Sequence, residues 1–509
     1  MSPLLIDGST LTCDDVVSVA RDRKPVTIAP AVRERIEQAR NVVEALAAGD
    51  AVAYGITTGF GHLARVKISR EELDKLQRNL ILSHAVGTGN PFPDEVVRAM
   101  LLLRANSLAK GLSGVRFEVV ETLVRLLQND ICPLVPEKGS LGASGDLAPL
   151  AHLALALLGE GKVRVGGVEM PAREALSRAG ISALTLAPKE GLALINGTQA
   201  MTAVGALAVH DATTLAITAD AAACLSLEAL RGIAAAFDER IHEARPHRGQ
   251  VACARTLRHL LKGSHLVSEP GELRVQDAYS LRCVPQIHGA TRDALAYVRQ
   301  VIETEVNSAS DNPLIFQDGS VVSGGNFHGQ PVALAMDFLC MAASELGSVS
   351  ERRIERLLNP TLSALPAFLT RHGGVNSGFM IVHYTAAALV SENKLLSSPA
   401  SVDSIPVSAS QEDHVSMGLI SARKARQVVE NLARVLAAEL MCAAQAVDFR
   451  GPENLAPATR AVYDAVREVV PPLESDHWLY PDLESLTKLV AGGKIAKTLG
   501  PYLETRAEG

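Results

Sequence analysis

The segment at residues 139–150, which reads GSLGASGDLAPL, holds three consecutive small residues that could build a reactive group from the backbone itself. If the Gly145 nitrogen attacks the carbonyl carbon of Ala143, a five-membered ring closes, and glycine favours this because it tolerates a close backbone approach. Loss of water from Ser144 then leaves a methylidene group, a strong electrophile that no ordinary side chain supplies. We expect Asp146, the next residue, to help move protons during ring closure.

Three other interpretations of this segment stay open on the residues alone. It can be a glycine-rich loop that leads into a capped helix, which is the commonest role of such a composition. It can bind phosphate at a helix N-terminus, although it lacks the Lys-Ser/Thr ending of a P-loop and Asp146 would repel the phosphate. It can carry a nucleophilic serine, although residues 142–146 lack the final glycine of the nucleophile elbow.

Apolar residues at helical spacing predict that the elements around this segment are mostly helices. Either Ser144 or Asp146 is expected to cap a helix that runs to Leu157. Short strands are expected at residues 163–165, before a Gly-Gly turn, and around 315 and 321–322. Long helices are expected at residues 31–48, 198–236, 331–358, 377–396 and 417–446. We therefore predict a mainly α fold, a long-helix bundle with a smaller mixed N-terminal region that carries the glycine-rich loop.

The chain has 509 residues, enough for several compact units. Hydrophobic residues make up 47% of it and charged residues 21%, which is typical of a soluble protein with a large core. We expect an N-terminal region at residues 1–200, a central long-helix bundle at 201–469, and a C-terminal tail unit at 470–509. The apolar excess also favours subunit contacts, because obligate interfaces resemble a core cut in half.

Charge and composition argue against several classes of partner. The net charge is −7, aromatic residues are only 4%, and Lys and Arg form no large cluster, so we expect neither nucleic acid nor an anionic membrane as a partner. No uninterrupted apolar run reaches the roughly 18–20 residues of a membrane helix. Seven scattered cysteines indicate neither a disulfide framework nor a zinc site. The start MSPLLIDGSTLT shows no signal peptide, so a cytoplasmic location is expected.

Seven motifs in order along the chain resemble those of a known family, the aromatic amino-acid ammonia-lyases and aminomutases. These motifs are YGITTGFG at 54–61, GSLGASGDLAPL at 139–150, LINGTQ at 194–199, QDAYSLRC at 276–283, SDNP at 310–313, GGNFH at 324–328 and QEDHVSM at 411–417. The resemblance covers most of the chain, roughly residues 54–446. It implies a long-helix bundle assembled as a homotetramer, with each active site built from three subunits.

The resemblance also implies the cofactor. It is methylidene-imidazolone (MIO), formed autocatalytically from Ala143, Ser144 and Gly145 with Asp146 beside them, and no external cofactor or metal is expected. The residues do not decide whether this electrophile takes the amine of the substrate or its ring. The glycines of residues 54–61 predict a mobile lid around Tyr54.

Roles for single residues follow from the same resemblance. Tyr54 would be the base that takes the β-proton of the substrate, and Arg282 would clamp the substrate carboxylate through a bidentate pair. A polar pocket around the electrophile and the amine, and an aromatic ring packed against them, would be supplied by Asn196, Gln276, Tyr279 and Phe327. Taken singly, each motif also has a plainer structural explanation; for example, residues 59–64 fit a loose dinucleotide-binding pattern without a βαβ unit around it.

Substrate choice depends on fewer residues. Ser83 and His84 occupy the selectivity position of the family and resemble its histidine branch, and Glu412 supports this, because an imidazole offers one donor and one acceptor to such partners. Thr57 departs from this branch, which often has Asn there. The predicted reaction is elimination of ammonia from L-histidine to give trans-urocanate. A tyrosine or phenylalanine ammonia-lyase, an aminomutase, or a non-catalytic helical scaffold are the alternatives.

Overall fold

The structure, a computed structural model, describes residues 2–49, 54–59, 68–69 and 72–503. The chain divides into two compact units, each assembled from separate stretches of sequence. Unit 1 comprises residues 1–210, 299–337 and 399–424, and unit 2 comprises residues 211–298, 338–398 and 425–509. The predicted division at residues 200 and 469 stays a prediction; by contacts, residues 470–509 group with unit 2.

Unit 1 contains the shorter helices of the N-terminal half and the strands found among the described residues. Its helices, in chain order, are α1 (Cys13–Ala20), α2 (Pro30–Ala48), α3 (Leu73–His84), α4 (Asp94–Ala109), α5 (Phe117–Gln128), α6 (Leu147–Leu157), α7 (Ala172–Arg178) and α8 (Glu190–Ile195). Helix α4 is buried on almost every side and packs against α1, α2 and α5, so it forms the centre of this unit.

The strands form small two- and three-stranded sheets. The parallel pair is β1 (Leu4–Ile6) with β2 (Val26–Ile28), and the antiparallel sets are β3 (Thr88–Pro91) with β5 (Pro136–Lys138), then β4 (Ile131–Pro133), β6 (Lys162–Val165) and β7 (Val168–Pro171), and β8 (Leu314–Ile315) with β9 (Val321–Val322). The predicted strands at 163–165 and around 315 and 321–322 are confirmed. Of these strands, β4 and β5 pack against α6, and β5 leads into the loop before it.

Four long helices have residues in both units: α9 (Gln199–Ala229), α13 (Val284–Val306), α14 (Gln330–Leu358) and α17 (Gly418–Asp448). The remaining helices of unit 2 are α10 (Glu239–Glu243), α11 (Arg248–Leu260), α12 (Tyr279–Arg282), α15 (Pro360–Ser363), α16 (Met380–Leu396), α18 (Pro457–Arg467), α19 (Tyr480–Ala491) and α20 (Lys494–Thr498). Short 3₁₀ turns lie at Ala234–Phe237, Ala367–Leu369, Pro452–Asn454 and Gly500–Tyr502.

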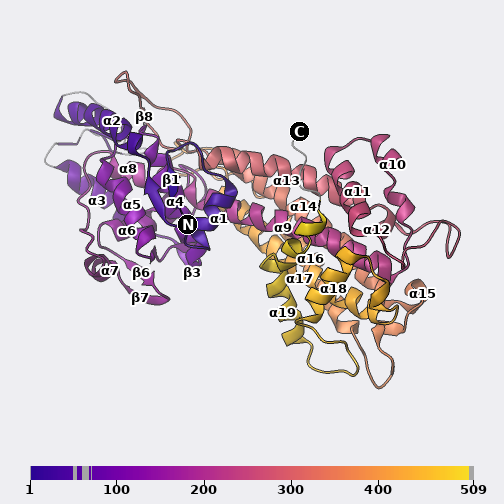
Figure 1. Cartoon of the computed structure of the whole chain (residues 1–509). Helices are drawn as coiled ribbons and strands as arrows, with labels where there is room; N and C mark the ends of the chain where they lie inside the picture. Colours follow the sequence, from indigo (N-terminus) through magenta and orange to yellow (C-terminus); the bar gives the residue numbers. More distant parts are fainter. Residues whose placement is uncertain (1, 50–53, 60–67, 70–71, 504–509) are drawn as a thin grey trace. The chain divides into compact units, whose positions relative to one another are not determined.

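In unit 2 the long helices lie side by side as a bundle (Figure 1), and buried charges join them. Glu439 on α17 accepts hydrogen bonds from Arg353 on α14 at 2.5 and 2.8 Å and from Ser226 on α9 at 2.8 Å. His288 on α13 contacts Asp220 on α9 at 2.7 Å. Because each buried charge has a charged or polar partner, the bundle tolerates them in its core. The predicted mainly α class is confirmed.

Helix predictions hold well in their centres and less well at their ends. The expected helices correspond to α2, α9, α14, α16 and α17, with ends shifted by a few residues; α9 stops at Ala229 where the pattern predicted residue 236. The prediction that Ser144 or Asp146 caps α6 is confirmed for the position of Asp146 but not for a side-chain hydrogen bond. Asp146 does stand at the N-cap, but its carboxylate makes no cap hydrogen bond, because it is engaged elsewhere in the loop.

Two helices, α9 and α14, are long and apolar enough to cross a membrane if judged by length and composition alone. In the structure, 72% and 61% of their apolar windows are buried inside the protein. Helix α9 also carries Asp220 and Glu228 fully buried among partners from neighbouring helices. This burial is the pattern of core helices, which are apolar on most sides.

Candidate active site

The glycine-rich loop of residues 139–146 connects β5 to α6 and is held by the carboxylate of Asp146. This carboxylate is fully buried; its Oδ1 accepts a hydrogen bond from Ser140 Oγ at 2.8 Å, and its Oδ2 accepts one from the Met201 N–H at 2.7 Å. Burial raises the pKa of Asp146 to about 6. A carboxyl group with this pKa gives and takes protons near neutrality, as proton transfer during ring closure would require.

The loop comes into direct backbone contact with residues 196–197. Gly145 and Gly197 form a parallel bridge, and the Asp146 N–H donates to the Gly197 carbonyl oxygen at 2.7 Å. A Cβ atom on Gly145 would lie 2.1 Å from that oxygen, and Gly145 has φ of +70°. Glycine is therefore required here both by space and by backbone conformation.

Ser144 is joined to a chain of buried polar groups. Its Oγ donates to Asn196 Oδ1 at 2.6 Å, and Asn196 Nδ2 donates to Asp311 Oδ1 at 3.2 Å and to the Asn312 carbonyl oxygen at 3.1 Å. Lys189 Nζ donates to the other oxygen of Asp311 at 2.6 Å. The structure thus brings the predicted residues Ser144 and Asn196 into contact.

The segment at residues 411–417 packs against the same loop. The Met417 N–H donates to the Leu141 carbonyl oxygen at 2.8 Å, and Ser416 Oγ donates to the Gly142 carbonyl oxygen at 3.2 Å. Ala143 lies in a small apolar cluster with Val415 and Met417. Two motifs that are about 270 residues apart in the sequence therefore pack against each other around residues 141–143.

Four other predicted residues also belong to unit 1: Tyr54, His84, Phe327 and Glu412. All four are partly buried. Two residues after Tyr54, the buried Ile56 packs with Ala39 and Val43 of α2. The predicted lid at 54–61 extends over residues 60 and 61, which lie outside the described residues.

His84 is the last residue of α3, and its ring is oriented by the helix. Its Nδ1 lies 2.8 Å from the Leu80 carbonyl oxygen, which can only accept, so Nδ1 carries the hydrogen. Partial burial lowers the pKa of His84 and favours its neutral form. The Nε2 atom is then a hydrogen-bond acceptor. Partial burial also raises the pKa of the Glu412 carboxyl, so this group holds a proton more readily than a solvated glutamate.

The remaining predicted residues, Gln276, Tyr279 and Arg282, belong to unit 2. Gln276 and Tyr279 are exposed, the latter at 69%. Arg282 lies over the Tyr279 ring, with its Cζ 4.8 Å from the ring centroid, on the one-turn helix α12. The guanidinium group therefore faces the Tyr279 ring.

The sequence did not identify every residue that matters in this region. The SDNP motif at residues 310–313 is one of the seven family motifs, yet no sequence pattern indicated that Asp311 would pair with Lys189. Arg104, fully buried on α4, donates to the Asn196 carbonyl oxygen at 3.1 Å and to Gln199 Oε1 at 2.8 Å. Its only signal was an arginine directly after the apolar run of residues 99–103, which indicates a buried polar partner.

A group of possible metal ligands, Asp220, Cys253 and His288, was also not evident from the sequence spacing. All three are buried in unit 2. Asp220 already has an ion pair with Arg292 and a hydrogen bond with His288. These two partners account for its buried charge, and the expectation of no metal stays a prediction.

Comparisons with known proteins identify the family and the fold. The family model described as aromatic amino acid lyase matches residues 11–468. A histidine ammonia-lyase of Symbiobacterium thermophilum is 58% identical over 489 residues, 96% of each chain. Among solved structures, tyrosine aminomutase from Streptomyces globisporus matches with a TM-score of 0.96 at 40% identity over 100% of both chains. Histidine ammonia-lyase from Trypanosoma cruzi matches with a TM-score of 0.93 at 45% identity, covering 99% of this chain and 96% of that one. This chain belongs to the aromatic amino acid lyase family.

Proposed function

We propose that this protein is a histidine ammonia-lyase, a carbon–nitrogen lyase that converts L-histidine to trans-urocanate and ammonia. The observation that carries the proposal is the hydrogen bond from Ser144 to Asn196 beside the Gly145–Gly197 contact, in a chain 58% identical to the Symbiobacterium thermophilum enzyme. The reaction is the predicted first step of histidine degradation.

Residues 143–145 fit the MIO group by their surroundings. Gly145 has no side chain to obstruct ring closure, the Ser144 hydroxyl is already held by a buried acceptor, and Asp146 lies next to both with its pKa near 6. When formed, the group supplies an electrophile that assists departure of the substrate amine. No added cofactor is part of the proposal.

The other roles belong to ordinary side chains. Tyr54 takes the β-proton, and the Arg282 guanidinium binds the substrate carboxylate by paired hydrogen bonds. Phe327 packs against the aromatic part of the site, and Gln276, Tyr279 and Asn196 complete the polar lining. Holding the reacting atoms in contact in this way removes much of the entropic barrier to elimination.

His84 and Glu412 select the imidazole ring. With its hydrogen on Nδ1, His84 presents Nε2 as an acceptor for the N–H of the substrate ring. A protonated Glu412 can donate to the second ring nitrogen, and its raised pKa favours that state. A phenyl or phenol ring would leave at least one of these groups unmatched, which costs about 1–3 kcal/mol for each unmet partner.

We also propose that the enzyme is a homotetramer whose active sites combine residues of different subunits. Large apolar side chains remain exposed along two helices: Leu334, Phe338 and Met341 on α14, and Ile381 and Tyr384 on α16, at 45–60% exposure. Patches of this kind are typical of subunit interfaces.

The test is to mix purified protein with L-histidine and to follow urocanate absorbance and free ammonia together. Equal appearance of both products is expected. The structural similarity to tyrosine aminomutase, together with Thr57, keeps an aminomutase as the second candidate. That enzyme would re-add the ammonia at the β-carbon, so a β-amino acid without free ammonia would refute the proposal.

A further inference from the structure

Lys189 and Asp311 form a completely buried ion pair close to the glycine-rich loop. Lys189 Nζ lies 2.6 Å from Asp311 Oδ2, and both side chains have 0% exposure. Removing two charges from water is costly, and a buried pair often stabilises a fold no better than apolar residues would. A pair of this kind calls for an explanation beyond stability.

The backbone conformation at Lys189 supports the same conclusion. Lys189 has φ of +77° and ψ of −25°, a left-handed conformation that a residue with a side chain adopts only at a cost. Conformations of this kind persist where the surrounding structure enforces them, and they gather at functional sites. The structure therefore maintains both a buried charge and a strained backbone in order to place one ammonium group.

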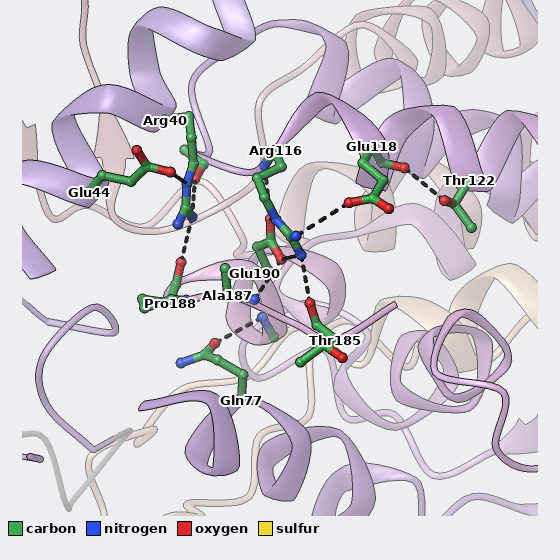
Figure 2. Close-up of polar contacts among 12 residues, drawn as sticks. Arg40, Glu44, Gln77, Arg116, Glu118, Thr122, Thr185, Ala187, Pro188 and Glu190 are labelled. Atoms are coloured by element: carbon green, nitrogen blue, oxygen red, sulfur yellow. Dashed lines mark hydrogen bonds and ion pairs between the residues drawn. The ribbon is translucent and has the colours of Figure 1, made fainter. Parts of the chain in front are cut away.

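Hydrogen bonds and an ion pair hold the residues on each side of Lys189, as Figure 2 shows. Arg116 binds the fully buried Glu190 carboxylate through two hydrogen bonds of 2.8 and 2.7 Å. Arg40 donates to the Pro188 carbonyl oxygen at 3.0 Å, and the Gly191 N–H donates to Gln77 Oε1 at 2.9 Å. These contacts come from α2, α3 and the N-cap of α5, and they hold the segment in the conformation that directs Lys189 to Asp311.

Asp311 in turn determines which way the Asn196 amide faces. The Asn196 Nδ2 atom lies between two groups that can only accept, the Asp311 carboxylate and the Asn312 carbonyl oxygen. The amide oxygen must then face Ser144, whose Oγ is 2.6 Å away. A flipped amide would set oxygen against oxygen at Asp311, a repulsive arrangement.

We propose that the Lys189–Asp311 pair positions Asn196 so that the Ser144 hydroxyl is held for dehydration when the MIO ring forms. This inference rests on the proposed function. Lys189 and Asp311 are positioning residues that act through Asn196.

The chemistry balances without any added reagent. Ring closure forms a bond between the Gly145 nitrogen and the Ala143 carbonyl carbon, and the carbonyl oxygen leaves as water with the amide hydrogens of Gly145 and Ser144. A second water takes the Cα hydrogen and the Oγ hydroxyl of Ser144. Because the hydroxyl hydrogen is held by Asn196 Oδ1, the lone pairs of Oγ remain free to receive the proton with which the oxygen departs.

The experiment measures the intact mass of purified, unfolded chains, which reports ring formation without any substrate. Wild-type protein should be lighter than the sequence mass by two waters. Asp311→Asn should fold but form the ring about tenfold to a hundredfold more slowly, the effect of losing a charged hydrogen bond. Glu439→Gln is the matched control, since it weakens an equally buried ion pair in unit 2 that does not contact Asn196. It should mature fully.

If folded Asp311→Asn matures like wild type, the inference is wrong while the proposed function stands. If wild type itself loses no water, the proposed function fails, and with it this inference. Circular dichroism shows whether Asp311→Asn folds. If it does not, the inference is tested with the double variant Lys189→Met/Asp311→Asn, which leaves no unpaired charge. A double variant that is folded and immature supports the inference; one that is folded and mature, or unfolded, overturns it.

Discussion

Gly145 lies so close to Gly197 that a Cβ atom added to it would be 2.1 Å from the Gly197 carbonyl oxygen. The two residues pair as a parallel bridge although they are 52 positions apart, and the next N–H along, that of Asp146, donates to the same oxygen. Close contact between two backbones is what holds the loop in place beside Asn196, and it depends on the absence of a side chain.

We therefore expect Gly145→Ala to abolish ring formation, because the methyl group would push residues 143–146 away from Gly197. Intact mass should equal the unmodified chain. Gly166→Ala is the control: it has a similar positive φ of +57° but nothing within 4 Å of the added atom. It should mature fully and lose only about 1 kcal/mol of stability from the left-handed backbone. A mature Gly145→Ala protein would contradict the assigned contact.

Ser144→Ala should remove the dehydration step and reduce histidine turnover to near background. The fold should survive, because the change deletes one partly buried hydroxyl and leaves Asn196 bonded to Asp311 and Asn312. Circular dichroism, intact mass and urocanate formation should be measured on the same preparation. Near-normal turnover would overturn the proposed mechanism.

His84→Leu should lower kcat/KM for histidine by about tenfold to a hundredfold, since it removes the acceptor for the imidazole N–H. Ring formation should be unaffected and visible as the loss of two waters. His477→Leu, a histidine in unit 2 paired with Asp482, serves as the control and should leave KM unchanged. An unchanged KM in His84→Leu would refute its role in selectivity.

Glu228→Gln should change the pH dependence of stability. Burial raises the pKa of Glu228 from 4.5 to about 7, so the folded state binds its proton more tightly than the unfolded state does. The stabilising contribution of the protonated group is complete below pH 4.5 and is lost as the pH rises to about 7. Between pH 5 and 8, the free energy of unfolding should fall by up to about 3 kcal/mol more in wild type than in the variant. Urea unfolding at the two pH values measures this difference. An equal change in the free energy of unfolding in wild type and variant would contradict the prediction.

Arg116→Met should destabilise the protein by about 3–5 kcal/mol, because it leaves the Glu190 carboxylate buried without its charged partner. Arg178→Met removes a similar ion pair whose side chains are 65% and 47% exposed, and it should cost no more than about 1 kcal/mol. Urea denaturation midpoints provide the comparison. Equal effects of the two variants would mean that the Arg116–Glu190 pair stabilises the segment beside Lys189 no more than an exposed ion pair does.

Local pattern was sufficient for much of the fold. Helical periodicity located α2, α14, α16 and α17 because each buries one face, and a buried face leaves a regular repeat in the sequence. Ends were less certain, since α9 ends at Ala229, just before the positive φ of Arg231, and not where its apolar composition ends. Asp146 was predicted as a cap of α6 and stands at its N-cap, but its carboxylate bonds to Ser140 and Met201, partners that the local sequence does not display.

The chemistry proposed for residues 143–146 also depends on local sequence, since ring closure requires neighbouring atoms of one short segment, although the residues alone left other interpretations open. What only the tertiary structure decided is how this segment is held. The Gly145–Gly197 contact and the chain from Lys189 through Asp311 and Asn196 to Ser144 join residues from distant parts of the chain. Such contacts leave no periodic trace, because a buried charge is satisfied by whichever partner the fold brings to it.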